Sequence, residues 1–164
     1  MMISANMNGK LNEQVTAEFA AAQKYLAMAC ALEAKGLKYL SKRFVDQYEE
    51  ERKHGMKIVR YLLEVGAAVT LDALPKPTPD TSSLKSIVQA ALDGERDITR
   101  RIHELVAQAE AEKDYSTLEF LQWFVDEQVE EVSTMVQLLK IVELAGPNVL
   151  QVEAYMRHEL IEKS

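Results

Sequence analysis

The chain has 164 residues, 48% of them hydrophobic, which is enough for one compact domain with a sizeable core. Its formal net charge of −7 argues against nucleic acid or an anionic membrane as a partner, since both attract basic surfaces. One cysteine cannot form a disulfide within the chain, and no apolar stretch reaches the ~18 residues of a membrane span. The N-terminal residues 1–8 lack the pattern of a signal peptide. We therefore expect a cytoplasmic protein, with Cys30 as a small filler of the core.

Apolar residues recur with a helical period along almost the whole chain, and turn residues divide it into five predicted helices. The helices lie near 9–36, 38–65, 83–111 and 114–145, with a short fifth helix at about 147–162. Asn8 is the expected N-cap of the first helix, and Ser82 or Ser83 that of the third. Gly36 and Gly66 are expected to end the first two helices. We expect a single domain over 1–164, with the bundle at about 9–145.

The lengths of the connections predict the topology of the bundle. Only a few residues join the first helix to the second and the third to the fourth, so each pair is an antiparallel hairpin. The connection near 67–82 contains Pro75, Pro77 and Pro79, which favour an extended backbone. About fifteen such residues at roughly 3.1 Å each span some 45 Å, close to the ~42 Å of a 28-residue helix. The predicted fold is all-α, a four-helix bundle with one long crossover connection.

A carboxylate interrupts the apolar stripe of each long helix near its middle. The four carboxylates are Glu18, Glu51, Glu95 and Glu131. Glu51 follows Glu18 by 33 residues, and Gln128 follows Glu95 by the same 33 residues. Glu51-x-x-His54 therefore aligns with Gln128-x-x-Glu131, and the two hairpins bring polar groups to one level of the bundle.

Four ionised carboxylates inside a core are unstable, because each loses several kcal/mol of hydration and all repel one another. Two divalent cations would balance their total charge of −4 if His54 is neutral. Glu51 and His54 lie on one helical face, so an oxygen and an imidazole nitrogen can bind the same ion. Carboxylate and imidazole ligands without a thiolate favour iron or manganese, although zinc can also bind. The concurrence of four helices favours a metal site over four solvent-facing glutamates.

The ordered set of these residues resembles the non-haem bacterial ferritins over essentially the full length of the chain. The matching segments are Leu11–Val15 with Glu18 and Tyr25, Glu50-Glu51-x-x-His54, Glu95, and Phe120–Gln128 followed by Glu130-Glu131. The resemblance implies a ferritin-like bundle with a short C-terminal fifth helix. It also implies a ferroxidase that uses dioxygen or peroxide to oxidise Fe(II), and that stores the ferric mineral in a shell of 24 subunits.

The resemblance also assigns roles to individual residues. The first iron would bind Glu18, Glu51 and His54, and the second would bind Glu51, Glu95 and Glu131. Gln128 would contact bound dioxygen or water, and Tyr25 would lie near the irons and supply an electron. A third, weaker iron position would use Glu50, Glu127, Glu130 and Glu131. For Glu50, Glu127 and Glu130, a solvated acidic face is an equally good interpretation.

Two departures from the bacterioferritins predict that no haem is bound. Arg52 stands near the place of their haem-binding methionine, and Glu130 stands where their second E-x-x-H motif has its histidine. We expect iron as the metal, with two ions in each subunit. A third ion is expected in a subunit whose weaker position is occupied. The rival functions are a di-iron oxygenase or peroxidase without storage, and a helical scaffold whose acidic residues face solvent.

Overall fold

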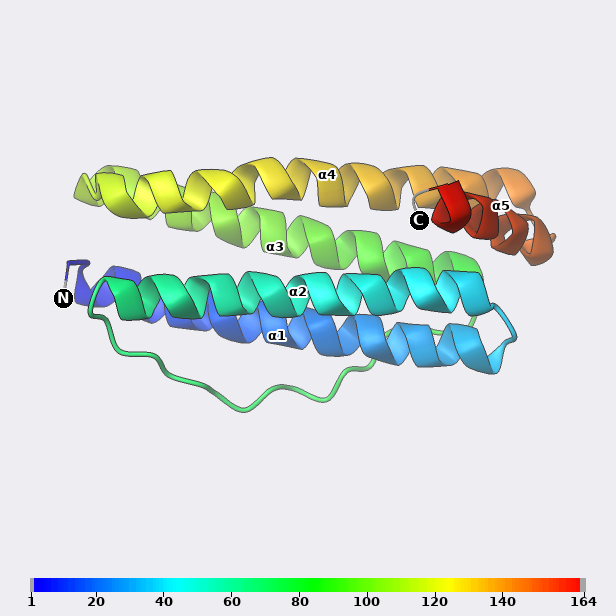
Figure 1. Cartoon of the computed structure of the whole chain (residues 1–164), viewed down its shortest axis with the longest axis horizontal. Helices are drawn as coiled ribbons and strands as arrows, with labels where there is room; N and C mark the ends of the chain where they lie inside the picture. The colour runs from blue at the N-terminus through cyan, green and yellow to red at the C-terminus, as the bar shows by residue number, and fades with distance from the viewer. Residues whose placement is uncertain (1, 163–164) are drawn as a thin grey trace.

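The computed structural model describes residues 2–162, and its described part consists of five α-helices without a strand (Figure 1). The helices are α1 Ala5–Ala34, α2 Lys38–Glu64, α3 Leu84–Glu112, α4 Tyr115–Ala145 and α5 Val149–Glu162. The four long helices form a bundle, and α5 packs against α2 and α4 at one end of it. The expected all-α fold with a short C-terminal fifth helix is confirmed.

Local sequence signals explain most helix ends. Ser83 accepts a hydrogen bond from the backbone nitrogen of Ser86 at 3.0 Å, as expected of an N-cap. The expected N-cap Asn8 is wrong, because α1 begins at Ala5 with Ser4 as its cap. The Ser4 hydroxyl accepts from Met7 N at 2.9 Å, and the fully buried Met7 side chain fixes this extra turn to the core. Gly36, with a φ of +81°, follows the end of α1.

The long connection between α2 and α3 runs along the length of the bundle beside α1, and it makes α2 and α3 parallel (Figure 1). Asn12 of α1 holds the beginning of this connection. Its Nδ2 donates to Ala68 O at 3.0 Å, and its Oδ1 accepts from Thr70 N at 2.6 Å. The predicted crossover is therefore present, and two hydrogen bonds attach it to the first helix.

The apolar core has two clusters, one toward each end of the bundle. Phe44, Leu32 and Met135 belong to the cluster near α5, whereas Leu11 and Phe124 belong to the other. Burial of each such side chain stabilises the fold by about 1.5–3 kcal/mol. The buried polar side chains of α1–α4 lie on the same inward stripes as these apolar residues.

The fifth helix is attached to the bundle by apolar packing and by hydrogen bonds to one carboxylate. Val152 and Met156 are buried in the cluster near the end of the bundle. Glu153 accepts hydrogen bonds from Tyr39 N at 2.7 Å and Leu40 N at 3.1 Å, at the start of α2. No side chain within α2 caps its N-terminus in this way, so Glu153 supplies the missing acceptor from another helix.

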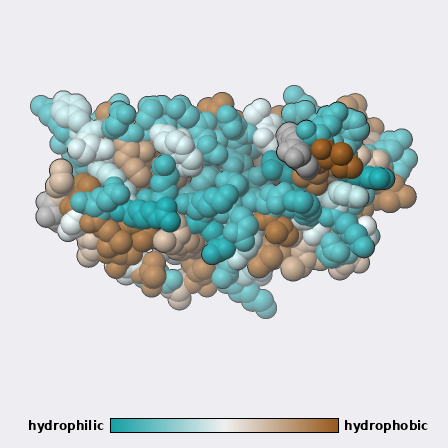
Figure 2. Space-filling view, viewed as in Figure 1, coloured by the Kyte–Doolittle hydropathy of each residue, from teal (hydrophilic) through white to brown (hydrophobic). Residues whose placement is uncertain are grey.

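The face seen in Figure 2 is mainly hydrophilic, with hydrophobic side chains along the edge of α1 and the crossover connection and beside α5. None of the described helices is long and apolar enough to cross a membrane. Cys30 is exposed, so the expectation of a core filler is wrong. Its position falls next to Ala29 on α1 but outside the inward stripe.

Candidate metal centre

Seven polar side chains from all four long helices are buried at one level of the bundle, each at most 6% exposed. They are Glu18 of α1, Gln47, Glu51 and His54 of α2, Glu95 of α3, and Gln128 and Glu131 of α4. Charged and amide side chains are rarely buried to this extent unless they are paired or bind a metal. Their helical spacing of three or four residues places them on the faces that also carry the core.

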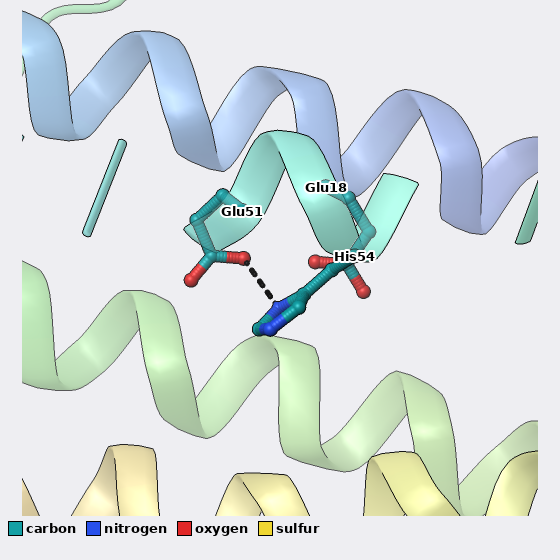
Figure 3. Close-up of side chains that lie close together, drawn as sticks. All are labelled: Glu18, Glu51 and His54. Carbon is teal, nitrogen blue, oxygen red and sulfur yellow. Dashed lines mark ion pairs between the residues drawn. The ribbon is translucent and has the colours of Figure 1, made fainter. Parts of the chain in front are cut away.

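Glu18, Glu51 and His54 form a close group in which one possible ligand atom from each lies within 4.8 Å of the others (Figure 3). Glu51 and His54 lie one turn apart on α2, with Glu51 Oε2 at 3.3 Å from His54 Nδ1. Glu18 reaches toward them from α1. Two carboxylates and an imidazole thus converge from two helices, which is a ligand set suited to Fe(II), Mn(II) or Zn(II).

Four ligand atoms of this group are buried without a hydrogen bond among the described residues, and Glu51 Oε2 has only the 3.3 Å contact with His54 Nδ1. They are Glu18 Oε2, Glu51 Oε1, Glu51 Oε2 and His54 Nε2. Each unsatisfied buried polar group costs about 1–3 kcal/mol, and more where it is charged. A cation among them would satisfy these lone pairs together, so the donor set fits a metal ion.

Burial changes the acidity of these carboxyl groups. It raises the pKa of Glu18 well above its usual range, and the charge of Glu51 adds to this effect. The pKa of Glu51 is raised in the same way, first by burial and then by the charge of Glu95. Burial and the charge of Glu95 raise the pKa of Glu131 to about 7. A bound cation would reverse these shifts, because it favours the ionised form of every carboxylate.

Glu95 is held by hydrogen bonds from two other helices. Tyr25 of α1 donates its hydroxyl proton to Glu95 Oε1, and Gln128 Nε2 of α4 lies 3.3 Å from Glu95 Oε2. Gln128 Nε2 also lies 3.1 Å from the hydroxyl of Thr99. Both Tyr25 and Gln128 therefore lie beside a predicted ligand.

The second predicted iron set, Glu51, Glu95 and Glu131, is close enough for its charges to interact. Within residues 2–162, however, Glu95 belongs to neither group of ligand atoms that lie within 4.8 Å of one another. Its oxygens are directed to Tyr25 and Gln128 instead. The second iron set stays a prediction.

The second close group brings together His54, Glu127 and Glu131, again with one ligand atom each within 4.8 Å. Glu127 is half-buried, at the edge of the bundle interior. Among the described residues, neither close group contains the other two members of the predicted third position. Glu50 forms an ion pair with Lys53 at 2.8 Å, and Glu130 is exposed. The structure thus brings Glu127 and Glu131 together and leaves Glu50 and Glu130 in a surface setting.

Two glutamines that orient the carboxylates have no role in the sequence-based prediction. Gln14 Nε2 donates to Glu18 Oε1 at 2.7 Å, and Gln47 Nε2 donates to Glu131 Oε2 at 2.7 Å. Gln14 precedes Glu18 by one helical turn, and Gln47 precedes Glu51 by one turn. An amide on an apolar stripe one turn before a buried carboxylate is the signal that could have identified them.

Comparisons with known proteins cover the helices that carry this centre. The family model described as a ferritin-like domain matches residues 8–145. Ferritin BfrB of Mycolicibacterium smegmatis is 33% identical over 158 residues, which cover 96% of this chain and 87% of that protein. A bacterial non-heme ferritin of Staphylococcus epidermidis is 39% identical over 133 residues, which cover 81% of this chain and 80% of that protein.

Solved structures agree with the fold. An open-pore ferritin from the hyperthermophilic archaeon Archaeoglobus fulgidus superposes with a TM-score of 0.92 and 35% sequence identity, covering 94% of this chain and 96% of that chain. An engineered closed form of that protein gives a TM-score of 0.91 with 36% identity, at coverages of 94% and 96%. The structural similarity therefore extends over most of the chain.

Proposed function

The chain belongs to the ferritin-like family, and we propose that it oxidises Fe(II) at the buried carboxylate–histidine centre and stores the ferric product. One observation carries this proposal. Four ligand atoms of Glu18, Glu51 and His54 converge in the core without hydrogen-bond partners among the described residues. The names of the bacterial non-heme ferritin and ferritin BfrB relatives agree with iron as the substrate.

The ligands favour oxidation because anionic oxygen donors stabilise Fe(III) more than Fe(II), which lowers the reduction potential of the bound iron. Each Fe(II) gives up one electron. Two bound ions together supply the two electrons that reduce one dioxygen to hydrogen peroxide, or one peroxide to water. Cation binding also displaces protons from carboxyl groups whose pKa burial has raised, such as Glu18 and Glu51.

The proposed ligands keep the sequence-based assignment. Glu18, Glu51 and His54 bind the first iron, and Glu51 bridges to a second iron on Glu95 and Glu131. The hydrogen bonds of Tyr25 and Gln128 to Glu95 support their places beside this pair. For the third, weaker position, the group of His54, Glu127 and Glu131 supports Glu127 and Glu131 more strongly than it supports Glu50 and Glu130. We keep the expectation that no haem binds.

Storage needs a cavity larger than the interior of one bundle, so we propose a closed homo-oligomer of 24 subunits in the cytoplasm. Large apolar side chains are exposed at the C-terminal end of α4 and on α5, where a neighbouring subunit could cover them. They are Leu144 at 88%, Leu150 at 69% and Ile161 at 60%. We further propose that the whole chain is one domain.

The direct test adds Fe(II) to the metal-free protein in air and measures its oxidation by the rise of ferric absorbance. Glu51→Gln keeps the shape of the proposed bridging ligand but removes its charge. We expect this variant to lower the initial rate at least about 100-fold, since it disturbs both iron positions. Glu49→Gln, on the exposed side of the same helix, is the matched control and should keep the wild-type rate. Equal rates for wild type and Glu51→Gln would reject the proposed centre.

Gel filtration separates storage from the rival functions. A shell of several hundred kilodaltons that retains ferric mineral supports the ferritin function. A monomer or dimer that consumes dioxygen without retaining iron supports the oxygenase or peroxidase alternative. A chain that neither assembles nor oxidises Fe(II) supports the helical scaffold.

A further inference from the structure

A glycine directly follows the histidine of the metal centre. Gly55 lies inside α2, where glycine is less favourable than alanine, so its presence calls for a packing reason. A methyl group at Gly55 would lie 2.7 Å from Cε1 of Phe19, 3.0 Å from Cδ1 and 3.1 Å from Cζ. Carbon atoms in contact prefer a separation of about 3.5–4.0 Å. The edge of the Phe19 ring therefore occupies the space that a side chain at Gly55 would need.

The ring belongs to the residue after Glu18. Phe19 and Gly55 thus meet between α1 and α2 one residue away from Glu18 and His54 on the same two helices. Phe19 also packs against the apolar cluster that contains Leu11. The ring cannot move away from α2 without losing part of that packing. The contact of the ring edge with Gly55 therefore limits how closely α1 approaches α2 at the level of the metal centre.

We propose that Gly55 is a positioning residue for the metal centre. Without a side chain at Gly55, the Phe19 ring lies directly on α2 and holds Glu18 and His54 at a separation that lets them bind one cation. To bring the 2.7 Å contact to an ordinary separation, a methyl group there must move the ring or the helices by roughly 0.8–1.3 Å, whereas metal–ligand distances tolerate only about 0.2 Å. This inference rests on the proposed metal centre and adds a residue that does not touch the metal.

The chain offers a matched control in Gly94, which also lies inside a long helix and directly precedes Glu95. A methyl group at Gly94 meets no atom within 4 Å. Gly55→Ala and Gly94→Ala therefore make the same chemical change beside a residue of the centre. Both replace glycine by a better helix former, but only Gly55→Ala meets an aromatic ring.

The test is titration of the full-length, metal-free protein with Co(II), which binds without being oxidised under anaerobic conditions and reports its ligands by visible absorbance. We expect Gly55→Ala to keep the circular dichroism and gel-filtration behaviour of wild type but to bind Co(II) at least about tenfold more weakly. The d–d bands of bound Co(II) should also change. Gly94→Ala should bind within about twofold of wild type. Wild-type affinity in Gly55→Ala would overturn the inference.

A second variant covers the case in which Gly55→Ala does not fold. Gly55→Ala/Phe19→Leu restores room at the contact, because leucine lacks the rigid ring edge that the methyl group meets. We expect this double variant to fold and to recover Co(II) affinity to within about threefold of wild type. A folded double variant that still binds Co(II) about tenfold more weakly than wild type would overturn the inference. Failure of wild type itself to bind Co(II) would instead reject the proposed function, and the inference with it.

Discussion

The hydroxyl of Tyr25 on α1 donates a hydrogen bond to Glu95 Oε1 on α3, between two side chains that are each at most 3% exposed. Burial, followed by the charge of Glu95, raises the pKa of Tyr25 well above its usual range. Tyr25 therefore keeps its proton at neutral pH and remains a donor. Burial raises the pKa of Glu95, and the hydrogen bonds from Tyr25 and Gln128 offset part of that rise.

Tyr25→Phe should make cation binding more sensitive to acid. Loss of a hydrogen bond to a charged group costs about 1.5–3 kcal/mol, so the pKa of Glu95 should rise further when the Tyr25 hydroxyl is removed. Protons should then compete with the cation up to a higher pH. We expect the midpoint of Co(II) binding against pH to rise by about one unit. Tyr61→Phe is the control, because the Tyr61 hydroxyl is bonded to Thr117 at 2.8 Å and is not one of the polar groups of the metal centre. Identical midpoints in wild type and Tyr25→Phe would contradict this role.

Glu131 should make the metal-free protein less stable as the pH rises. Its pKa is about 7 in the fold against 4.5 as an ordinary glutamate, so the folded state holds the proton more tightly between these values. The stabilisation is complete below pH 4.5 and is lost as the pH rises through 7, by up to about 3 kcal/mol. We expect Glu131→Gln to remove this contribution, while it keeps an acceptor for Gln47.

Denaturant unfolding of the metal-free protein from pH 4.5 to pH 8 measures this effect. The difference in stability between Glu131→Gln and wild type should grow in favour of the variant as the pH rises. Glu130→Gln, an exposed neighbour, should follow the wild-type curve at every pH. A constant difference between Glu131→Gln and wild type would show that Glu131 titrates normally.

Glu153 should control how firmly α5 is attached. Glu153→Ala removes the acceptor for Tyr39 N and Leu40 N, and loss of such a cap costs about 1 kcal/mol. We expect faster hydrogen exchange at these two amides and faster proteolysis within α5. Gln151→Ala, at an exposed position of the same helix, should leave both rates unchanged. Unchanged exchange in Glu153→Ala would mean that apolar packing alone holds the helix.

Asn12 should hold the start of the crossover connection. Asn12→Ala removes the bonds to Ala68 O and Thr70 N, and should destabilise the fold by roughly 1–3 kcal/mol. The affected segment is the connection between α2 and α3, so we expect faster proteolysis there at a nearly unchanged rate of Fe(II) oxidation. Asn148→Ala, outside this connection, should not change the cleavage pattern. Resistance to proteolysis equal to wild type would contradict this anchoring.

The sequence alone determined much of this protein, because a helix repeats every 3.6 residues and a core must be apolar. That period places Glu18, Glu51, Glu95 and Glu131 on inward faces, and all four are buried. The prolines of the long connection predicted the crossover for a similar reason, since proline restricts the backbone locally. Both are properties of neighbouring residues, so they can be recognised without coordinates.

The tertiary structure decided which atoms meet. Periodicity does not encode the distance between helices, their relative register or the side-chain rotamers, so it could not pair Glu153 with the start of α2 or Gln47 with Glu131. It also could not show that His54 lies close to Glu127, or that the Phe19 ring rests on Gly55. These contacts join residues of different helices. They depend on atomic positions to within a few tenths of an ångström, which only the packing of the whole bundle sets.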